Sequence, residues 1–258
     1  MTATVTMDPR IRARRDAVRA ELGRRRIRRF VGFATVVALV AAAGLATRSP
    51  LLDVDEVGIT GATATSEADV ISASGVAPGQ ALIDVDLASA RRSIAALPWV
   101  DEVRSTRSWN GAISFEVTER EPVAQAIVDG HVVLVDIEGR VLEVPGVADD
   151  DLVVVTGVSG SAEPGGWLAS TALDALGVAA AVDADLVDRI GAIEVQADGS
   201  LDVQLDESGR VRLGGAIELD AKLLALQTML ERVDLQCLDI LDLQVPTVPV
   251  LTRQGSCS

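Results

Sequence analysis

The chain has few aromatic residues and little His or Cys. Only 2% of its 258 residues are aromatic, Tyr is absent, and His131 is the single His. Cys237 and Cys257 are the two Cys, both late in the chain. Metal sites and catalytic triads need several converging groups, so this set predicts no catalytic residue and no metal site. The core is expected to consist of Val, Leu, Ile and Ala.

Phosphate-binding patterns are also missing. The pairs Gly165-Gly166 and Gly214-Gly215 are not followed by the Lys-Ser or Lys-Thr of a P-loop. The sequence therefore predicts no cofactor, no small-molecule substrate and no enzymatic activity. An alternative from another class is a membrane-anchored enzyme acting on the cell wall, which would need a nucleophile or metal set. A single-pass envelope receptor is a second alternative.

The charge is divided unevenly along the chain. Residues 1–29 contain ten Arg against three acidic residues, a local charge of +7, whereas the whole chain has a net charge of −15. The remainder therefore carries −22. An acidic bulk would repel a phosphate backbone, and the basic tail lacks aromatic residues that stack on bases, which argues against nucleic-acid binding.

One segment is apolar and long enough to cross a membrane. Residues 30–47 contain no charged side chain, and as a helix they would extend about 27 Å. Five Arg lie just before this segment and only Arg48 follows closely. The positive-inside rule then predicts a cytoplasmic tail, residues 1–29, a membrane helix, residues 30–47, and an extracytoplasmic remainder. A cleaved signal peptide, with Gly44 and Ala46 before the cut, is the alternative.

The segment 51–121 has the pattern of a small α+β domain. A strand ending at Gly61 is followed by a helix capped by Ser66 and a second helix capped by Asp86. Strands at residues 100–109 and 112–119 then flank Asn110-Gly111, which predicts a two-residue hairpin turn. The predicted order is strand, helix, helix, strand, strand.

The segment 122–251 predicts a mostly antiparallel β domain with flanking helices, followed by a tail, residues 252–258. Asp129-Gly130 and Asp198-Gly199 are hairpin turn signals. Helices are expected at residues 168–182 and along the Leu219, Leu223, Leu226 and Leu230 face. The last strands are expected at residues 238–245 and 248–251.

Several strings in this order resemble the FtsQ/DivIB family of bacterial division proteins, whose first external domain is a POTRA domain. They are Ile59-Thr60-Gly61, Leu97-Pro98-Trp99-Val100, Arg107-Ser108-Trp109, and Val117-Thr118-Glu119-Arg120-Glu121-Pro122-Val123-Ala124. The resemblance is strong over residues 54–144 and moderate over 208–251, and residues 146–207 are interpreted from pattern alone. The sequence departs from the family at Asn110, where Pro is frequent, and at Gln244, where Arg is usual.

The resemblance implies a non-enzymatic divisome scaffold in the bacterial cytoplasmic membrane at the division septum, linking early and late division proteins. It also implies partners of the FtsB-like and FtsL-like kind, which are coiled-coil membrane proteins bound through C-terminal strands. An exposed strand edge can accept a partner strand, and this places the predicted partner-binding residues at Val248, Val250 and Leu251. Pro246 and Pro249 leave open the alternative that this edge is merely protected from pairing.

The two Cys leave a further question open. In an oxidising compartment, Cys237 and Cys257 could form a disulfide or remain two free thiols, because the sequence does not give their Cα separation.

Overall fold

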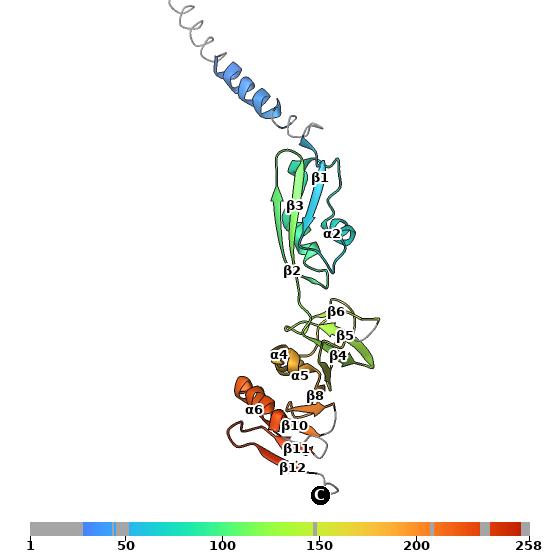
Figure 1. Ribbon diagram of the computed structural model, residues 1–258. Helices are drawn as coiled ribbons and strands as arrows, with labels where there is room; N and C mark the ends of the chain where they lie inside the picture. The colour runs from blue at the N-terminus through green and yellow to red at the C-terminus, as the bar shows by residue number, and fades with distance from the viewer. Residues whose placement is uncertain are drawn as a thin grey trace, which may run out of the picture. The chain divides into compact units, whose positions relative to one another are not determined.

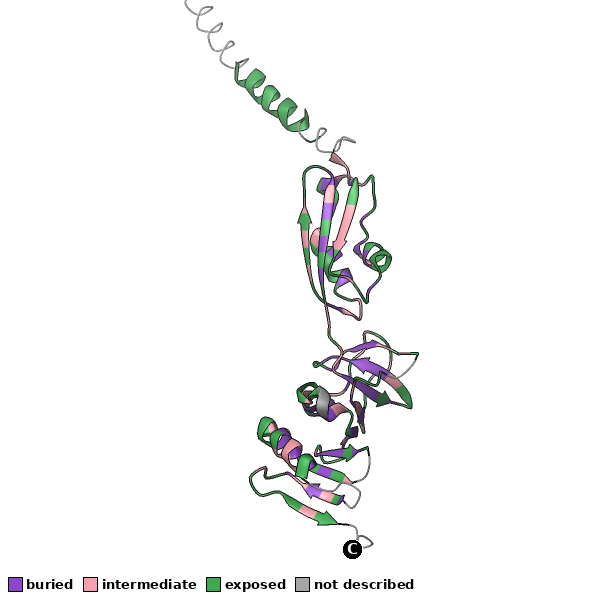
Figure 2. Ribbon diagram, viewed as in Figure 1, coloured by how far each residue is buried: buried purple, intermediate pink, exposed green. Residues whose placement is uncertain are grey.

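The structure is a computed structural model that describes residues 28–42, 44, 52–146, 149–206, 209–232 and 238–253 (Figure 1). It contains a three-stranded sheet and a nine-stranded sheet, together with short helices. The predicted mixed α+β class is confirmed. Figure 2 shows that buried residues are concentrated in the two sheets and the helices that accompany them.

The small sheet has the strand order β1-β3-β2. It consists of β1 (Glu56–Thr60), β2 (Val100–Arg107) and β3 (Ala112–Glu119). Helices α2 (Glu67–Ser74) and α3 (Leu87–Ile94) lie between β1 and β2 in the sequence, which confirms the predicted order of elements. A short 3-10 helix, η2 (Leu82–Asp84), which was not predicted, precedes α3.

Both predicted helix caps are present. The Ser66 side chain accepts a hydrogen bond from the Asp69 N–H, and the Asp86 carboxylate accepts bonds from the N–H groups of Ala88 and Ser89. These acceptors satisfy donors that the first turn of a helix leaves without an intrahelical partner. Alternate residues of β3 are buried: Ile113, Phe115 and Val117. Successive side chains of a strand point to opposite faces of the sheet, so this pattern shows that one face of β3 is covered.

The turn between β2 and β3 differs from the prediction of a two-residue turn. Residues 108–111 form a four-residue connection in which Ser108 N–H donates to the Ala112 carbonyl at 2.9 Å. The Gly111 carbonyl accepts hydrogen bonds from Asp55 and Glu56, at 2.8 and 3.3 Å. These bonds hold Gly111 against the start of β1 and leave Trp109 outside the strand ladder.

A first compact unit comprises the described residues of Met1–Val57 together with Val76–Val85 and Arg107–Ile113. Within it, Val54 N–H donates to the Gln80 carbonyl and Gly79 N–H donates to the Val54 carbonyl, both at 2.8 Å. The Arg107 guanidinium donates to the Val85 carbonyl. The segment around Val54, one loop and the β2–β3 turn are therefore hydrogen-bonded together.

The second compact unit comprises Gly58–Gly75, Asp86–Thr106 and Ser114–Ser258, as far as these are described, and contains the nine-stranded sheet. The strand order is β12-β11-β10-β9-β8-β7-β4-β5-β6. The strands are β4 (Ala124–Val128), β5 (His131–Val135), β6 (Val141–Glu143), β7 (Val154–Thr156), β8 (Ile190–Val195), β9 (Leu201–Leu205), β10 (Arg210–Gly214), β11 (Leu238–Asp242) and β12 (Val250–Arg253).

Five of the eight neighbouring pairs in this sheet are antiparallel. The other three pairs, β4 with β7, β7 with β8, and β10 with β11, are parallel. A parallel pair needs a crossover connection, and helices supply two of them. Helices α4 (Leu173–Ala181) and α5 (Ala184–Val187) join β7 to β8, and α6 (Leu219–Arg232) joins β10 to β11.

Helix α4 begins later than the predicted residue 168. Leu168 forms an isolated bridge with Gly160, and Trp167 forms one with Arg140, so these two residues are paired before any helix starts. A short 3-10 helix, η3 (Ser170–Ala172), then leads into α4. Helix α6 buries Leu223, Leu226 and Leu230, as its leucine period predicts.

Two strings that carry the family resemblance meet in the second unit. The Arg120 guanidinium pairs with the carboxylates of Asp136 and Glu138 at 2.6 and 2.8 Å, and its Nε donates to the Val100 carbonyl. Burial alone would lower the pKa of Arg120, but the hydrogen bonds with Glu138 and Asp136 raise it above its ordinary value.

A second arginine completes this cluster. The guanidinium of Arg140 donates to the carbonyls of Ala96 and Pro98, at 2.9 and 3.3 Å. Both arginines also lie over the ring of Trp167, at 5.3 Å for Arg140 and 6.0 Å for Arg120. Cationic side chains therefore satisfy the backbone carbonyls that follow α3.

In the part of the chain that the structure describes, no helix combines the length and the apolar character that crossing a bilayer would require. The tail at residues 1–27 lies outside the described residues, as do residues 43 and 45–47 of the predicted membrane segment. Cys237 and Cys257 also lie outside them, so the question of a disulfide stays open.

Candidate partner-binding edge

Strand β12 forms one end of the nine-stranded sheet and pairs with β11 alone among the described strands. The register aligns Val250 with Asp242, Leu251 with Leu241 and Thr252 with Ile240. A strand at the end of a sheet presents a row of N–H and C=O groups to which another strand can bond.

A register shift in β11 brings a side chain into the ladder. Between Leu238 and Ile240 the pairing with β12 is irregular. There the Thr252 hydroxyl accepts a hydrogen bond from Ile240 N–H at 3.2 Å and lies 3.3 Å from the Ile240 carbonyl. This side chain therefore ties the bulge to β12.

The structure places the three predicted partner-binding residues in different surroundings. Val250, the first residue of β12, is 56% exposed. Val248 is exposed in the preceding turn, where its N–H donates to the Val245 carbonyl. Leu251 is half-buried and packs against the core of the nine-stranded sheet. Val248 and Val250 are thus accessible, whereas Leu251 also supports the fold.

Both prolines lie before the edge strand. Pro246 and Pro249 precede Val250, and residues 250–253 contain no Pro. Proline removes an N–H donor only at its own position, so every residue of β12 keeps its backbone donor. The strand is short, but its edge is not blocked by proline.

An apolar groove of about 380 Å³ lies next to the start of β12. Helix α6 supplies one wall and the turn before β12 supplies the other: Ala221, Leu224, Ala225, Thr228, Met229, Pro246, Thr247 and Pro249. Leu224 is exposed although it is large and apolar. The sequence contained a signal for this groove, because Leu224 lies off the buried leucine face of α6.

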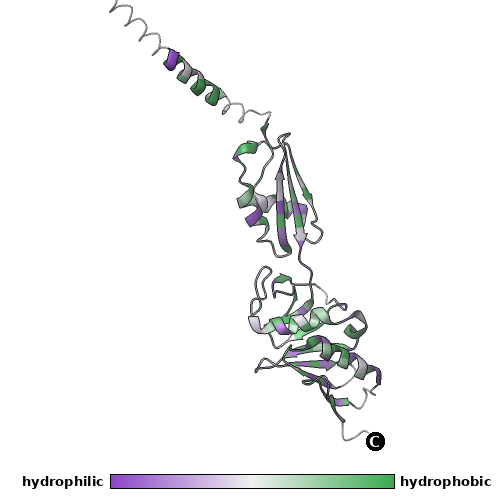
Figure 3. Ribbon diagram, turned by 90° about the vertical axis from the view of Figure 1, so that its left-hand side faces the viewer, coloured by the Kyte–Doolittle hydropathy of each residue, from purple (hydrophilic) through white to green (hydrophobic). Residues whose placement is uncertain are grey.

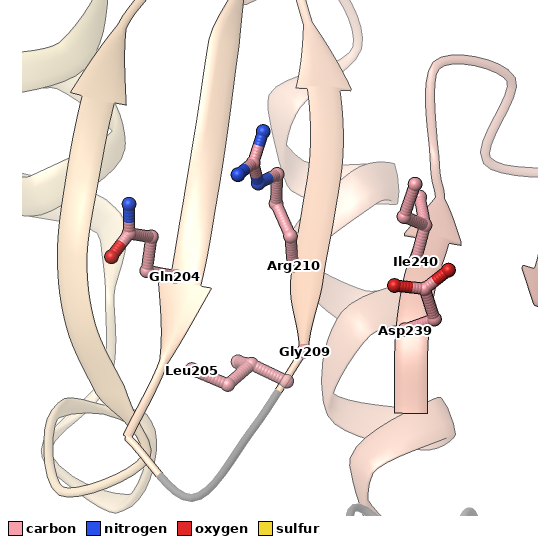
Figure 4. A pocket seen from close by; sticks show the side chains of 6 residues that line it. All are labelled: Gln204, Leu205, Gly209, Arg210, Asp239 and Ile240. Carbon is pink, nitrogen blue, oxygen red and sulfur yellow. The ribbon is translucent and has the colours of Figure 1, made fainter. Parts of the chain in front are cut away.

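A second hollow, of about 480 Å³, lies over β9, β10 and β11 (Figure 4). Gln204 pairs with Arg210, and Arg210 pairs with Ile240, so these side chains lie side by side on neighbouring strands. Arg210 lies 3.5 Å from the Asp202 carboxylate and is about half exposed. Asp239 also lines the hollow, and the Gln204 amide donates to the Glu194 carboxylate at 3.2 Å. The hollow therefore has polar side chains of both signs beside an apolar one, and the sequence pattern did not predict it.

Among the described residues, no group of three or more His, Cys, Asp or Glu side chains converges in a way that could hold a metal ion. His131 is exposed at the start of β5, where it pairs with Val128. The arrangement at the β12 end of the sheet is suited to protein binding through backbone hydrogen bonds and apolar contacts.

Comparison with known families decides the family. Residues 52–120 match the POTRA domain of the FtsQ type, and residues 126–244 match the C-terminal domain of the cell division protein FtsQ/DivIB. The chain belongs to the FtsQ/DivIB family. The C-terminal match ends at residue 244, so β12 and the three predicted partner-binding residues lie beyond it.

Individual members of the family give the same result. The cell division protein FtsQ of Corynebacterium glutamicum is 30% identical over 199 residues, which cover 76% of this chain and 87% of that protein. The FtsQ of Anaeromyxobacter sp. is 32% identical over 240 residues, covering 86% of this chain and 80% of that protein. The FtsQ of Streptomyces griseus is 38% identical over 92 residues, covering 35% and 44%.

Proposed function

We propose that this chain is a non-enzymatic scaffold of the divisome, which links early and late division proteins at the septum. Its membership in the FtsQ/DivIB family supports a role in cell division. The observation that carries the scaffold role is the edge strand β12, which ends the sheet, contains no Pro and exposes Val250. Such an edge binds an extended segment of another protein.

The proposed topology has one membrane helix. Residues 1–29 form the cytoplasmic tail, residues 30–47 cross the cytoplasmic membrane, and residues 51–121 form the POTRA domain. The β domain starts at residue 122 and extends past the predicted end at residue 251, because Thr252 and Arg253 belong to β12. Figure 3 shows hydrophobic residues along the described helix after a hydrophilic start. The ten Arg of the tail favour its retention on the cytoplasmic side.

The proposed partners are FtsB-like and FtsL-like coiled-coil membrane proteins. A short extended segment of such a partner would add a strand beside β12, with main-chain hydrogen bonds providing affinity. Val250 and Val248 would contact alternate side chains of that segment.

Imaging of dividing cells tests this role. A fluorescent protein fused to the N-terminus of the full chain should give a band at the division site. The same fusion to residues 1–47 alone should label the membrane uniformly, because it lacks the extracytoplasmic domains. Uniform labelling by an intact, full-length fusion would contradict the proposal.

A further inference from the structure

Trp109 is a large aromatic side chain left in solvent at the tip of the β2–β3 turn. It is 65% exposed, in a chain that has only three Trp. Two other hairpin turns among the described residues, Asp129-Gly130 and Asp198-Gly199, have the small and acidic residues usual at such positions. The turn between β5 and β6 exposes an apolar residue, Ile137, but at 47% it is less exposed than Trp109. Turn formation therefore does not explain why an exposed Trp occupies position 109.

The turn is hydrogen-bonded to residues near the start of the described segment that follows the predicted membrane helix. Asp55 N–H donates to the Gly111 carbonyl at 2.8 Å, two residues from Trp109. On the other side, Asp53 bridges to Ala81, and Val54 bonds to Gln80. Ile83, two residues beyond Ala81, is 44% exposed. Trp109 and Ile83 thus belong to loops held by the same three residues, 53–55.

The length of the connection limits how far this surface can be from the bilayer. Seven residues, 48–54, lie between position 47, the end of the predicted membrane helix, and Asp55. The eight Cα-to-Cα steps from 47 to 55 cover at most about 28 Å when fully extended, so the turn cannot move far from the membrane surface. A short tether of this kind gives an effective concentration on the order of millimolar, at which weak contacts become populated.

The chemistry of the surface suits the interfacial layer of a bilayer. Tryptophan concentrates at membrane interfaces because its ring is apolar and its N–H is a hydrogen-bond donor. Asp53, Asp55 and Asp84 lie in the same loops and would be repelled by anionic headgroups. The contact therefore does not depend on charge attraction, and a zwitterionic bilayer suits it best.

We infer that Trp109, together with Ile83, contacts the headgroup region of the membrane in which the chain is anchored. The contact would orient the membrane-proximal end of the POTRA domain at the bilayer. This inference rests on the proposed membrane helix at residues 30–47.

The test uses the full chain reconstituted in phosphatidylcholine nanodiscs, with or without lipids brominated near the top of the acyl chains. Two matched variants each retain one reporter: Trp99→Phe with Trp167→Phe leaves Trp109, and Trp99→Phe with Trp109→Phe leaves Trp167. The Trp109 reporter should lose about half of its emission in the brominated discs, whereas the Trp167 reporter should be unaffected. In the otherwise unchanged chain, Trp109→Phe should remove most of the lipid-dependent quenching, which avoids reliance on the double variants.

Two results would overturn the inference, and they differ from each other. Equal Trp109 emission in brominated and plain discs, with the chain retained in the discs, would exclude the lipid contact and leave the anchor standing. Elution of the chain separately from the discs would remove the anchor, and with it the inference.

Discussion

Glu119 lies in the string at residues 117–124 that resembles the family, and its carboxylate stabilises a neighbouring loop. Its carboxylate accepts hydrogen bonds from the N–H groups of Thr63, Ala64 and Thr65 at 3.0, 3.0 and 2.7 Å, and from the Thr63 hydroxyl. Desolvation alone would raise the pKa of Glu119, but the hydrogen bonds lower it from 4.5 to about 2. Glu119 thus fixes the loop that follows β1.

The lowered pKa gives a pH-dependent prediction. Because the folded-state pKa lies below the unfolded value, the stabilisation by Glu119 is fully present above about pH 4.5 and is lost as the pH falls towards 2. Glu119→Gln should reduce the free energy of unfolding by about 1 kcal/mol at pH 7, a small value because the side chain is partly exposed. Urea unfolding should show a smaller difference at pH 3.

The control for this prediction is Glu116→Gln, which changes an exposed residue of the same strand. It should leave the free energy of unfolding nearly unchanged at both pH values. A Glu119→Gln effect that is as large at pH 3 as at pH 7 would contradict the role given to the carboxylate.

Lys222 is the only Lys of the chain, and it is buried. It is 4% exposed, and its Nζ donates to the carbonyls of Leu213 and Gly215, both at 2.7 Å. Lys222→Met should lower the free energy of unfolding by about 1–3 kcal/mol, because two buried carbonyls lose a charged donor. Amine-reactive labelling followed by mass spectrometry should modify only the amino terminus of the folded protein, and Lys222 as well in urea. Rapid labelling of Lys222 under native conditions would show that this burial is wrong.

At the scale of elements, Gly111 joins the β2–β3 turn to β1. Its φ is 92°, and a Cβ at this position would lie 2.3 Å from the Asp55 carboxylate oxygen and 3.1 Å from the Asp53 carbonyl. Gly111→Ala should therefore cost about 2–3 kcal/mol through backbone strain and displacement of Asp55.

Gly130 supplies the comparison for that prediction, because its φ is 83° but nothing lies within 4 Å of a Cβ placed there. Gly130→Ala should cost only the conformational part, about 1 kcal/mol. Equal losses of thermal stability in the two variants would show that the close approach to Asp55 contributes nothing.

The sequence predicted elements whose signals are local. The helix caps at Ser66 and Asp86 and the Asp129-Gly130 turn depend on neighbouring residues, and all three are present. Asp129 and Gly130 both have positive φ, as the turn requires. The predicted length of the β2–β3 turn was wrong. Asp55 and Glu56, which are distant in the sequence, donate hydrogen bonds to the Gly111 carbonyl, and local sequence patterns do not encode this contact.

Long-range arrangements were beyond what the pattern could predict. A continuous nine-stranded sheet depends on which strands become neighbours, such as β4 with β7, and alternation within each strand does not encode this. The same limit applies to the hollow around Arg210 and the groove beside Leu224, whose walls come from separate elements. The predicted location of a binding edge near residues 248–251 used the resemblance to a known family.

At the scale of the whole molecule, two surfaces have different proposed roles. We propose that Trp109, in the β2–β3 turn, contacts the bilayer, and that β12, at one end of the nine-stranded sheet, pairs with a segment of another protein. The central claim is that the partner joins the edge at β12.

Co-purification of an FtsB-like partner with the full chain tests that claim most directly. Val250→Asp should weaken binding by about tenfold or more, since it places a charge at the edge where a strand would pack. Val144→Asp is the matched control, because Val144 is 50% exposed and follows β6 at the opposite end of the sheet. With circular dichroism unchanged in both variants, loss of binding in Val250→Asp alone is the predicted result. Equal binding by the two variants would contradict a partner site on β12.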